Sequence, residues 1–170
     1  KPANDAIEIH WARWSQRADI AGRMHLAHLL RVAMKAVARD GEALVRVVRN
    51  RDLPYGMALQ LLEIDRLDET MNATLQGGGA IRQGVEIDST GRPVAYWLKS
   101  AHPGDRYMPG STRAERVPAG DIRHVFLPER AEQVRGYTWL HAVLLRSAQL
   151  HGFNEAAVLE IGRASCRERV

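Results

Sequence analysis

The spacing of apolar residues predicts a helix at the start of the chain. Ile7, Trp11 and Trp14 recur at intervals of four and three residues, which places them on one helical face. Asp5 and Glu8 have the spacing of an N-terminal capping box. Large aromatic side chains on the apolar face of a helix favour core packing over stacking on a ligand, so we expect both tryptophans to be buried.

A second predicted helix is followed by a change to the pattern of strands. Its apolar stripe consists of Leu26, Leu29, Leu30, Ala33 and Val37. Gly41 follows this stripe in the position of a helix C-cap. Residues 42–50 (EALVRVVRN) are rich in β-branched side chains, and residues 57–65 (MALQLLEID) form a further predicted strand beyond the turn RDLPYG.

The remaining pattern predicts a hairpin, one more strand and a final helix. In residues 85–98, Val85 and Ile87 alternate with acidic residues, and the turn DSTG contains Gly91, which suits a positive φ. Residues 101–121 are predicted to form a loop and residues 121–127 a short strand, and Thr138 is expected to cap the last helix. The apolar stripe of that helix consists of Leu140, Val143, Leu144 and Ala148. Helices at both ends flanking a mostly antiparallel sheet with a β-hairpin indicate an α+β fold.

Composition is that of a folded protein. Of the 170 residues, 45% are apolar and 26% are charged, which is sufficient for one domain with a buried core. No run reaches the roughly 18 apolar residues that a membrane span needs. The chain begins at Lys1, with neither a Met nor an apolar leader, so we expect a piece of a longer protein. Without Cys166 no cysteine remains for disulfides or thiolate metal sites, which fits an intracellular or virion setting.

The net charge of +4 is a mild excess of basic residues. Residues 160–170 contribute three arginines and two glutamates, which leaves 21 basic and 18 acidic side chains in residues 1–159. A net charge of +3 permits contact with nucleic acid but does not argue for it.

Three carboxylates, Glu63, Asp65 and Asp68, could supply the oxygen ligands that a divalent cation takes in nucleases. The alternative to a structural function is therefore a metal-dependent nuclease or recombinase-type domain. Glu63 and Asp65 lie two residues apart at a strand end, and the sequence places no other acidic residue clearly beside them. We therefore favour the interpretation that these carboxylates lie at the edge of a strand and are exposed to solvent. We predict no catalytic residue, no cofactor and no metal site.

Other candidate motifs are weaker. His25 and His28 have a spacing that zinc ligands can show, but neither a partnering cysteine nor an HExxH motif accompanies them. The segment GGGAIRQG lacks the Gly-Lys-Ser/Thr ending of a phosphate-binding loop. Arg46, Arg49 and Arg51 flank a predicted strand and are possible phosphate contacts, although scattered exposed arginines are the simpler interpretation.

Several segments, in order, resemble the lambda-type portal proteins of tailed bacteriophages. The resemblance includes a helix-then-strand unit with the step Asp40-Gly41-Glu42. It continues through LEIDRLD at residues 62–68, the hairpin GVEIDSTGRPVAY, the segment HPGD, the long segment RVPAGDIRHVFLPERAEQVRGYTWL and the helix AVLLRSAQL. These segments span most of residues 7–159. No one motif is unique, but their order over this length is specific.

The resemblance implies a structural function rather than an enzyme. Members of this family form a ring of about twelve identical subunits at one capsid vertex, closed by heterologous contacts. Double-stranded DNA is packaged through the ring by a docked terminase, leaves through it later, and head-completion proteins bind to it. On this basis residues 1–159 are similar to the peripheral wing region of the portal, incomplete at both ends, without the stem and clip.

Residues 160–170 (EIGRASCRERV) depart from the rest of the chain. They contain Cys166 and three arginines, and the apolar helical spacing stops at Leu159. Codons can be chosen for this segment that reproduce a common sequencing-library adapter, whose next triplet is a stop. We therefore expect a non-native, disordered tail that contributes nothing to the fold.

Overall fold

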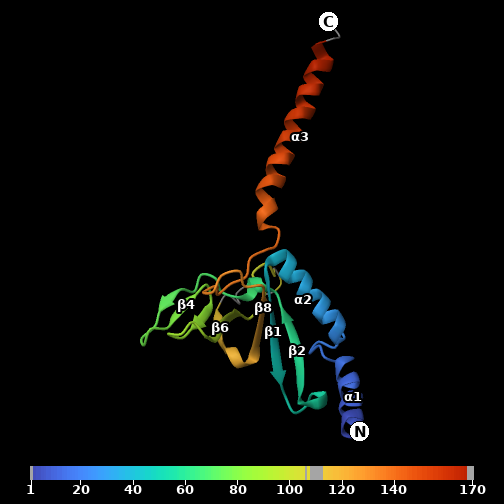
Figure 1. Cartoon of the computed structure of the whole chain (residues 1–170), viewed down its shortest axis with the longest axis vertical. Coiled ribbons are helices and arrows are strands. Elements are labelled where there is room, and N and C mark those ends of the chain that lie inside the picture. The colour runs from blue at the N-terminus through green and yellow to red at the C-terminus, as the bar shows by residue number, and fades with distance from the viewer. Residues whose placement is uncertain (1, 106, 108–112, 168–170) are drawn as a thin grey trace.

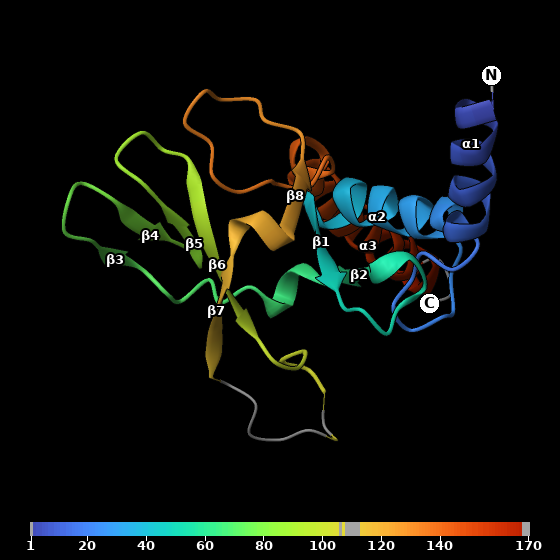
Figure 2. The same ribbon diagram turned by 90° about the horizontal axis from the view of Figure 1, so that it is seen from below.

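Three layers make up the body of the molecule. The computed structural model describes residues 2–105, 107 and 113–167, with side chains described as far as residue 160. One helix covers a three-stranded sheet, and a five-stranded sheet packs against the opposite face of that sheet (Figures 1 and 2). A helix at each end of the chain completes the structure, so the expected α+β fold is confirmed.

The three-stranded sheet has the order β2-β1-β8 and is antiparallel throughout. Its strands are β1 (Glu42–Arg49), β2 (Met57–Leu62) and β8 (Ile122–Phe126). Helix α2 (Leu26–Asp40) precedes β1 and ends at Gly41, whose φ of 96° is the left-handed conformation that glycine adopts without strain. The predicted C-cap is therefore confirmed.

The five-stranded sheet is an antiparallel meander with the order β3-β4-β5-β6-β7. Its strands are β3 (Ala73–Thr74), β4 (Ala80–Arg82), β5 (Val85–Ile87), β6 (Pro93–Lys99) and β7 (Ala114–Pro118). The predicted hairpin is the β5–β6 pair, and Gly91 in its turn has a φ of 84°.

The first half of strand β1 is buried on both faces, which explains the apolar run Ala43, Leu44 and Val45. Ala43 packs against Ala33 and Val37 of α2. Leu44, on the opposite face, belongs to the main core, which joins the two sheets. The other buried members of that core are Leu62, Leu67, Val85, Ile87, Tyr96, Leu98, Val117 and Ile122.

Helix α1 (Pro2–Ser15) is attached to the body mainly through its last turn. Trp14 is buried, and its indole N–H donates a hydrogen bond to the carbonyl oxygen of Met57 at 3.1 Å. Trp11 is 59% exposed and Ile7 is 67% exposed, so the expectation that both tryptophans are buried is wrong for Trp11. The reason is that the earlier turns of α1 extend beyond the edge of the sheet (Figure 1).

Residues 127–140, here termed the connector, lead from β8 to helix α3 (His141–Arg167). The end of the connector is bound to the last turn of α2: the Thr138 hydroxyl and the Trp139 N–H both donate to the carbonyl oxygen of Ala38, at 3.2 and 3.3 Å. The N–H of Leu140 donates to the Thr138 side chain at 3.1 Å, as expected of a helix cap. Helix α3 then extends away from the body (Figure 1).

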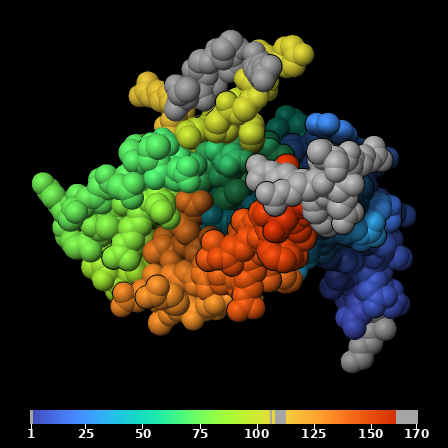
Figure 3. Space-filling view, turned by 90° about the horizontal axis from the view of Figure 1, so that it is seen from above, coloured from blue at the N-terminus to red at the C-terminus, as the bar shows by residue number. Residues whose placement is uncertain are grey.

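Viewed from above, the connector and α3 occupy the middle of the molecule (Figure 3). The five-stranded sheet lies on one side of them and the two amino-terminal helices lie on the other. The connector is thus placed where it can contact both sheets and α2.

Several predicted boundaries differ from the structure. The strand predicted for residues 57–65 ends at Leu62, because residues 64–66 form a 3-10 turn. The predicted loop 101–121 contains strand β7, and the glycine-rich segment contains β4, since pairing with neighbouring strands outweighs weak local preference. The helix expected to end at Leu159 continues to Arg167, so the backbone of residues 160–167 is helical. Residues 168–170 lie outside the described residues, and the adapter origin of the tail stays a prediction.

The approach of the connector to the end of α2 requires two glycines. A Cβ added at Gly136 would lie 2.3 Å from the carbonyl oxygen of Gly41 and 2.9 Å from the Cβ of Glu42. A Cβ at Gly41 would lie 2.2 Å from the backbone of Tyr137. Distances this short require the backbone to move.

We therefore expect Gly136→Ala to lower the free energy of unfolding by about 2 kcal/mol, the usual effect of overpacking. Gly120→Ala is the matched control, because nothing lies within 4 Å of an added Cβ at Gly120 and its backbone is not left-handed. Urea unfolding of the two variants would measure the difference. Equal stability of the two variants would contradict the close approach.

Candidate functional site

A buried carboxylate, Glu42, joins three parts of the fold. Glu42 is only 2% exposed, although its side chain is charged and stands at the start of a core strand. One carboxylate oxygen accepts hydrogen bonds from His124 Nε2 at 2.6 Å and from the backbone N–H of Gly136 at 2.8 Å. The other oxygen accepts from Arg135 Nε at 2.7 Å and lies 2.6 Å from a second guanidinium nitrogen. We call this arrangement the Glu42 node.

The Glu42 node also reaches the five-stranded sheet. The remaining terminal nitrogen of Arg135 donates to the carbonyl oxygen of Gln83 at 2.9 Å, in the turn between β4 and β5. His124 packs edge-on against the ring of Tyr96 on β6, with 5.6 Å between ring centroids. One carboxylate therefore connects β1, β8, the connector and the five-stranded sheet.

The pKa of the Glu42 carboxyl shows that its charge is well compensated. Burial by itself raises this pKa, but the hydrogen bonds from His124, Arg135 and Gly136 outweigh burial, so the pKa lies below its ordinary value. Burial, with the negative charge of Glu42 nearby, raises the pKa of the Tyr96 hydroxyl to about 12. The Glu42 carboxyl is thus ionised, and the neighbouring Tyr96 hydroxyl is neutral, across the physiological pH range.

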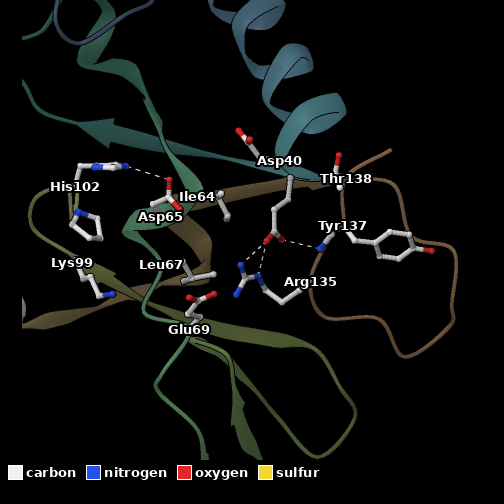
Figure 4. A pocket seen from close by; sticks show the side chains of 13 residues that line it. Asp40, Ile64, Asp65, Leu67, Glu69, Lys99, His102, Arg135, Tyr137 and Thr138 are labelled. Carbon is white, nitrogen blue, oxygen red and sulfur yellow. Dashed lines mark hydrogen bonds and ion pairs between the residues drawn. The ribbon is translucent and has the colours of Figure 1, made fainter. Parts of the chain in front are cut away.

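A cleft of about 800 Å³ lies beside the node (Figure 4). Its charged and titratable lining residues are Asp40, Glu42, Asp65, Glu69, Lys99, His102, Arg135 and Tyr137. Arg135 points into this cleft, and dashed lines mark its bonds to the Glu42 carboxylate. The cleft has both signs of charge, and Glu42 is already paired with Arg135 and Asp65 with His102, so these side chains hold the fold together.

Two of the three sequence-predicted carboxylates meet one histidine. His102 Nε2 lies 3.2 Å from a carboxylate oxygen of Glu63 and 3.2 Å from one of Asp65. The backbone N–H of Gly104 donates to His102 Nδ1 at 2.9 Å, so Nδ1 carries no proton and the ring donates from Nε2. A metal ion bound at Nε2 would require a proton on Nδ1, which would then face the N–H of Gly104. The geometry therefore suits hydrogen bonds that join the segment after β6, which contains His102, to the residues that follow β2.

The third carboxylate, Asp68, is held elsewhere. It accepts a hydrogen bond from the Thr70 hydroxyl at 2.8 Å and lies 3.5 Å from Lys99 Nζ. The Thr70 bond, followed by the charge of Lys99, lowers its pKa against the opposing effect of burial. Within residues 2–105, 107 and 113–167, no group of three or more His, Cys, Asp or Glu side chains is placed to hold a metal ion. The nuclease alternative built on Glu63, Asp65 and Asp68 thus has no support.

The three candidate phosphate-contacting arginines do not form one cluster. Arg46 is half-buried on β1 opposite Gln60 and Ile122, and Arg49 is paired with Asp121. Arg51 is exposed in the turn after β1. Since Arg46 and Arg49 lie three residues apart on a strand, their side chains leave opposite faces.

The histidine pair at residues 25 and 28 caps a helix. The backbone N–H of His28 donates to Nδ1 of His25 at 3.2 Å, which places His25 at the N-cap of α2. Nδ1 of His25 thus has a structural role as the cap of α2, whereas the side chain of His28 takes no part in this bond.

Comparison with known proteins shows which family this chain belongs to. A family model described as "Phage portal protein, lambda family" matches residues 1–166. A protein of Halomonas phage phiHAP-1, described as a probable portal protein, is 41% identical over 158 residues, which covers 91% of this chain. The chain belongs to the lambda family of phage portal proteins. It spans 30% of the length of the Halomonas phage relative. In the part of the portal chain that the structure describes, no helix has the length and apolarity needed to cross a bilayer.

The residues of the Glu42 node lie within the segments that resemble the portal family. Gly41 and Glu42 belong to the Asp-Gly-Glu step, and His124, Arg135 and Gly136 belong to the long segment that begins at Arg116. Sequence reasoning did not identify this site. The available signal was a glutamate at the first position of a strand whose other residues are mostly apolar, but its partners lie 82 to 94 positions away.

Glu42→Gln tests the node. Glutamine keeps the shape but leaves Arg135 without its counterion, so the free energy of unfolding should fall by about 3 kcal/mol. Glu115→Gln, the same change at an exposed position of β7, should change it by less than about 0.5 kcal/mol. Urea unfolding followed by circular dichroism measures both values. A Glu42→Gln variant as stable as the control would contradict a stabilising node.

The lowered pKa of Glu42 also predicts a pH dependence. A carboxyl whose folded-state pKa is depressed stabilises the fold above its ordinary pKa, and this contribution is lost as the pH falls through the folded-state pKa. The stability difference between the natural chain and Glu42→Gln should therefore be full at neutral pH and shrink below about pH 4. Urea midpoints measured over a pH series would show this. A difference that stayed constant to about pH 2 would contradict it.

Proposed function

We propose that this chain is part of a structural subunit of the portal ring, at the capsid vertex through which double-stranded DNA enters and leaves the phage head. The match to the lambda portal family over residues 1–166 carries this proposal. The 41% identity to the Halomonas phage protein agrees with it. In this proposal residues 1–159 form the wing region.

The partners follow from the portal function. The subunit contacts copies of itself in a ring of about twelve, closed by heterologous contacts. The assembled ring binds the terminase large subunit, capsid and head-completion proteins, and encloses double-stranded DNA. The protein is located in the virion, and in the cytoplasm of the bacterial host during assembly. It catalyses no reaction, because the energy for packaging comes from the terminase.

The geometry suits a rigid structural part. Three layers, with an apolar cluster on each face of β1, resist deformation because close-packed interiors have low compressibility. The Glu42 node and the two glycine contacts hold the connector on this body and so orient the base of α3. Arg46, Arg49 and Arg51 stay possible phosphate contacts, and of these Arg49 and Arg51 are exposed.

A chimeric portal protein tests the proposal. The matched segment of the Halomonas phage protein would be replaced by residues 1–159 of this chain, and the product would be examined by electron microscopy. We expect closed rings with a central hole. A chimera that is folded by circular dichroism and remains monomeric would contradict a portal function for this chain.

The same chimera with Glu42→Gln serves as an internal comparison. Because this change weakens the attachment of α3, we expect fewer closed rings from an equal amount of folded protein. The natural Halomonas phage protein, purified in parallel, shows the ring yield that an unaltered subunit reaches.

A further inference from the structure

The positive charge of this chain is concentrated in one segment. Residues 13–39, from the last turn of α1 to the end of α2, contain six basic residues and one acidic residue, a net charge of +5. Because the whole chain has a net charge of +4, all its other residues together carry −1. The mild excess of basic residues in the composition therefore conceals a strong asymmetry.

The one acidic residue of this segment does not neutralise its surface. Asp19 is only 7% exposed. Its two carboxylate oxygens accept hydrogen bonds from the backbone N–H groups of Ala21 at 3.3 Å and Arg23 at 3.0 Å, so the side chain is turned toward its own loop. The exposed charges of residues 13–39 are consequently all positive.

Two cations stand on the outer side of α2. Arg31 and Lys35 are exposed, whereas Leu29, Ala33 and Val37 are buried. At about 100° per residue, Arg31 and Lys35 lie about 180° around the helix from these buried residues, so they face away from the sheet. Like charges four residues apart on a helix repel each other. The first turn of α2 contains no acidic residue, so the helix dipole adds to the positive potential.

Three arginines, Arg13, Arg17 and Arg23, are exposed in the chain before α2. The loop between α1 and α2 is fixed to β2, because backbone hydrogen bonds of 2.7 and 2.8 Å join residues 18 and 20 to Leu59. Both helices lie on the side of the body away from the five-stranded sheet (Figure 2). We call the five exposed cations the basic surface: Arg13, Arg17, Arg23, Arg31 and Lys35.

The basic surface has no counterions of its own. In residues 2–105, 107 and 113–167, no ion pair involves any of its five side chains. Arg39, the next basic residue of α2, differs because it is paired with Asp40 at 2.7 Å. This bond, with the charges of Asp40, Glu63 and Asp65, raises the pKa of Arg39. The basic surface therefore ends at Lys35.

We propose that the basic surface binds the phosphate backbone of double-stranded DNA without reading its base sequence. The proposal rests on the portal function, which brings duplex DNA to the assembled ring. Duplex DNA carries about one negative charge per 1.7 Å of its axis, and contacts to its phosphates carry no sequence information. Arg31 and Lys35 lie about 6 Å apart along α2, so they can bind different phosphates. Five cations without counterions complement such a polyanion.

An acidic protein is the alternative occupant of this surface. Leu30 and Met34, on the neighbouring flank of α2, are 53% and 52% exposed and would suit such a partner. The centre of a protein–protein interface is depleted of charge, however, whereas protein–DNA interfaces are strongly positive. Five exposed cations, with no exposed carboxylate in residues 13–39, favour DNA.

Fluorescence anisotropy with a labelled duplex of about 20 base pairs tests the contact in the 170-residue chain. The logarithm of the association constant should fall with the logarithm of the salt concentration with a slope of about −4.5, because each of the five cations neutralises one phosphate. Two duplexes of unrelated sequence should bind equally. Absence of binding at about 0.05 M salt, or a clear preference for one sequence, would overturn the proposal.

Arg31→Gln combined with Lys35→Gln tests the named residues. Glutamine has a similar helix propensity, so the melting temperature should stay the same. The salt slope should become shallower by about 2, and the affinity at about 0.1 M salt should fall about tenfold.

Arg82→Gln combined with Arg130→Gln is the matched control. It removes the same charge from two exposed positions outside the basic surface, on β4 and on the connector, and should change the slope by less than about 0.5. Equal losses of slope in the two double variants would show that net charge governs binding, and would overturn the assignment to this surface.

Competition with polyglutamate distinguishes the acidic partner. An extended polyglutamate chain has about 3.4 Å per charge, roughly half the charge density of duplex DNA. At an equal concentration of charges it should displace the labelled duplex about tenfold less effectively than unlabelled duplex does. Equal displacement by both competitors would overturn the preference for DNA and point to an acidic protein.

These outcomes are separable from those of the proposed function. Chimeric rings that form normally, from a chain that binds no DNA through Arg31 and Lys35, would overturn the DNA contact and leave the portal function standing. Salt-dependent binding through these residues, in a chain whose chimera stays monomeric, would support the contact and contradict the portal function.

Discussion

Glu42 is the residue on which the arrangement of this molecule depends. A carboxylate that is 2% exposed is costly unless its hydrogen-bonding capacity is satisfied, and here His124, Arg135 and the N–H of Gly136 satisfy it. Because these donors come from β8 and from the connector, the charge cannot be buried unless both segments are in place. The cost of burying one charge thus specifies where the connector lies on the body.

Packing around the node reinforces this constraint. Gly41 ends α2 in a left-handed conformation, so the chain turns directly into β1 and brings Glu42 under the connector. Gly136 must lack a side chain because a Cβ there would lie only 2.3 Å from the carbonyl oxygen of Gly41. The node and the two glycines therefore act together. The charge of Glu42 attracts the connector through Arg135, and the missing side chains of Gly41 and Gly136 let the connector approach the end of α2. Helix α3 begins only a few residues further on.

The sequence predicted those parts of the fold that rest on local pattern. Periodicity predicted helix α2 and the two strands after it. Glycines that tolerate a positive φ predicted the end of α2 and the β5–β6 turn. It did not predict β3, β4 or β7, which are short strands that depend on their neighbours. The exposure of Trp11 was missed because periodicity shows that a helix has an apolar face but not whether the face is covered. The Glu42 node was missed because its members are distant in sequence, although all of them lie in segments that resemble the portal family.

Amide hydrogen exchange of the 170-residue chain tests most directly whether the node fixes the connector to the body. The Gly136 N–H donates to Glu42, and the Trp139 N–H donates to Ala38. If the connector detaches only when the body unfolds, these two amides exchange as slowly as the amides in the middle of β1. Rapid exchange at Gly136 and Trp139, with β1 still protected, would show that the connector opens independently and would contradict the account.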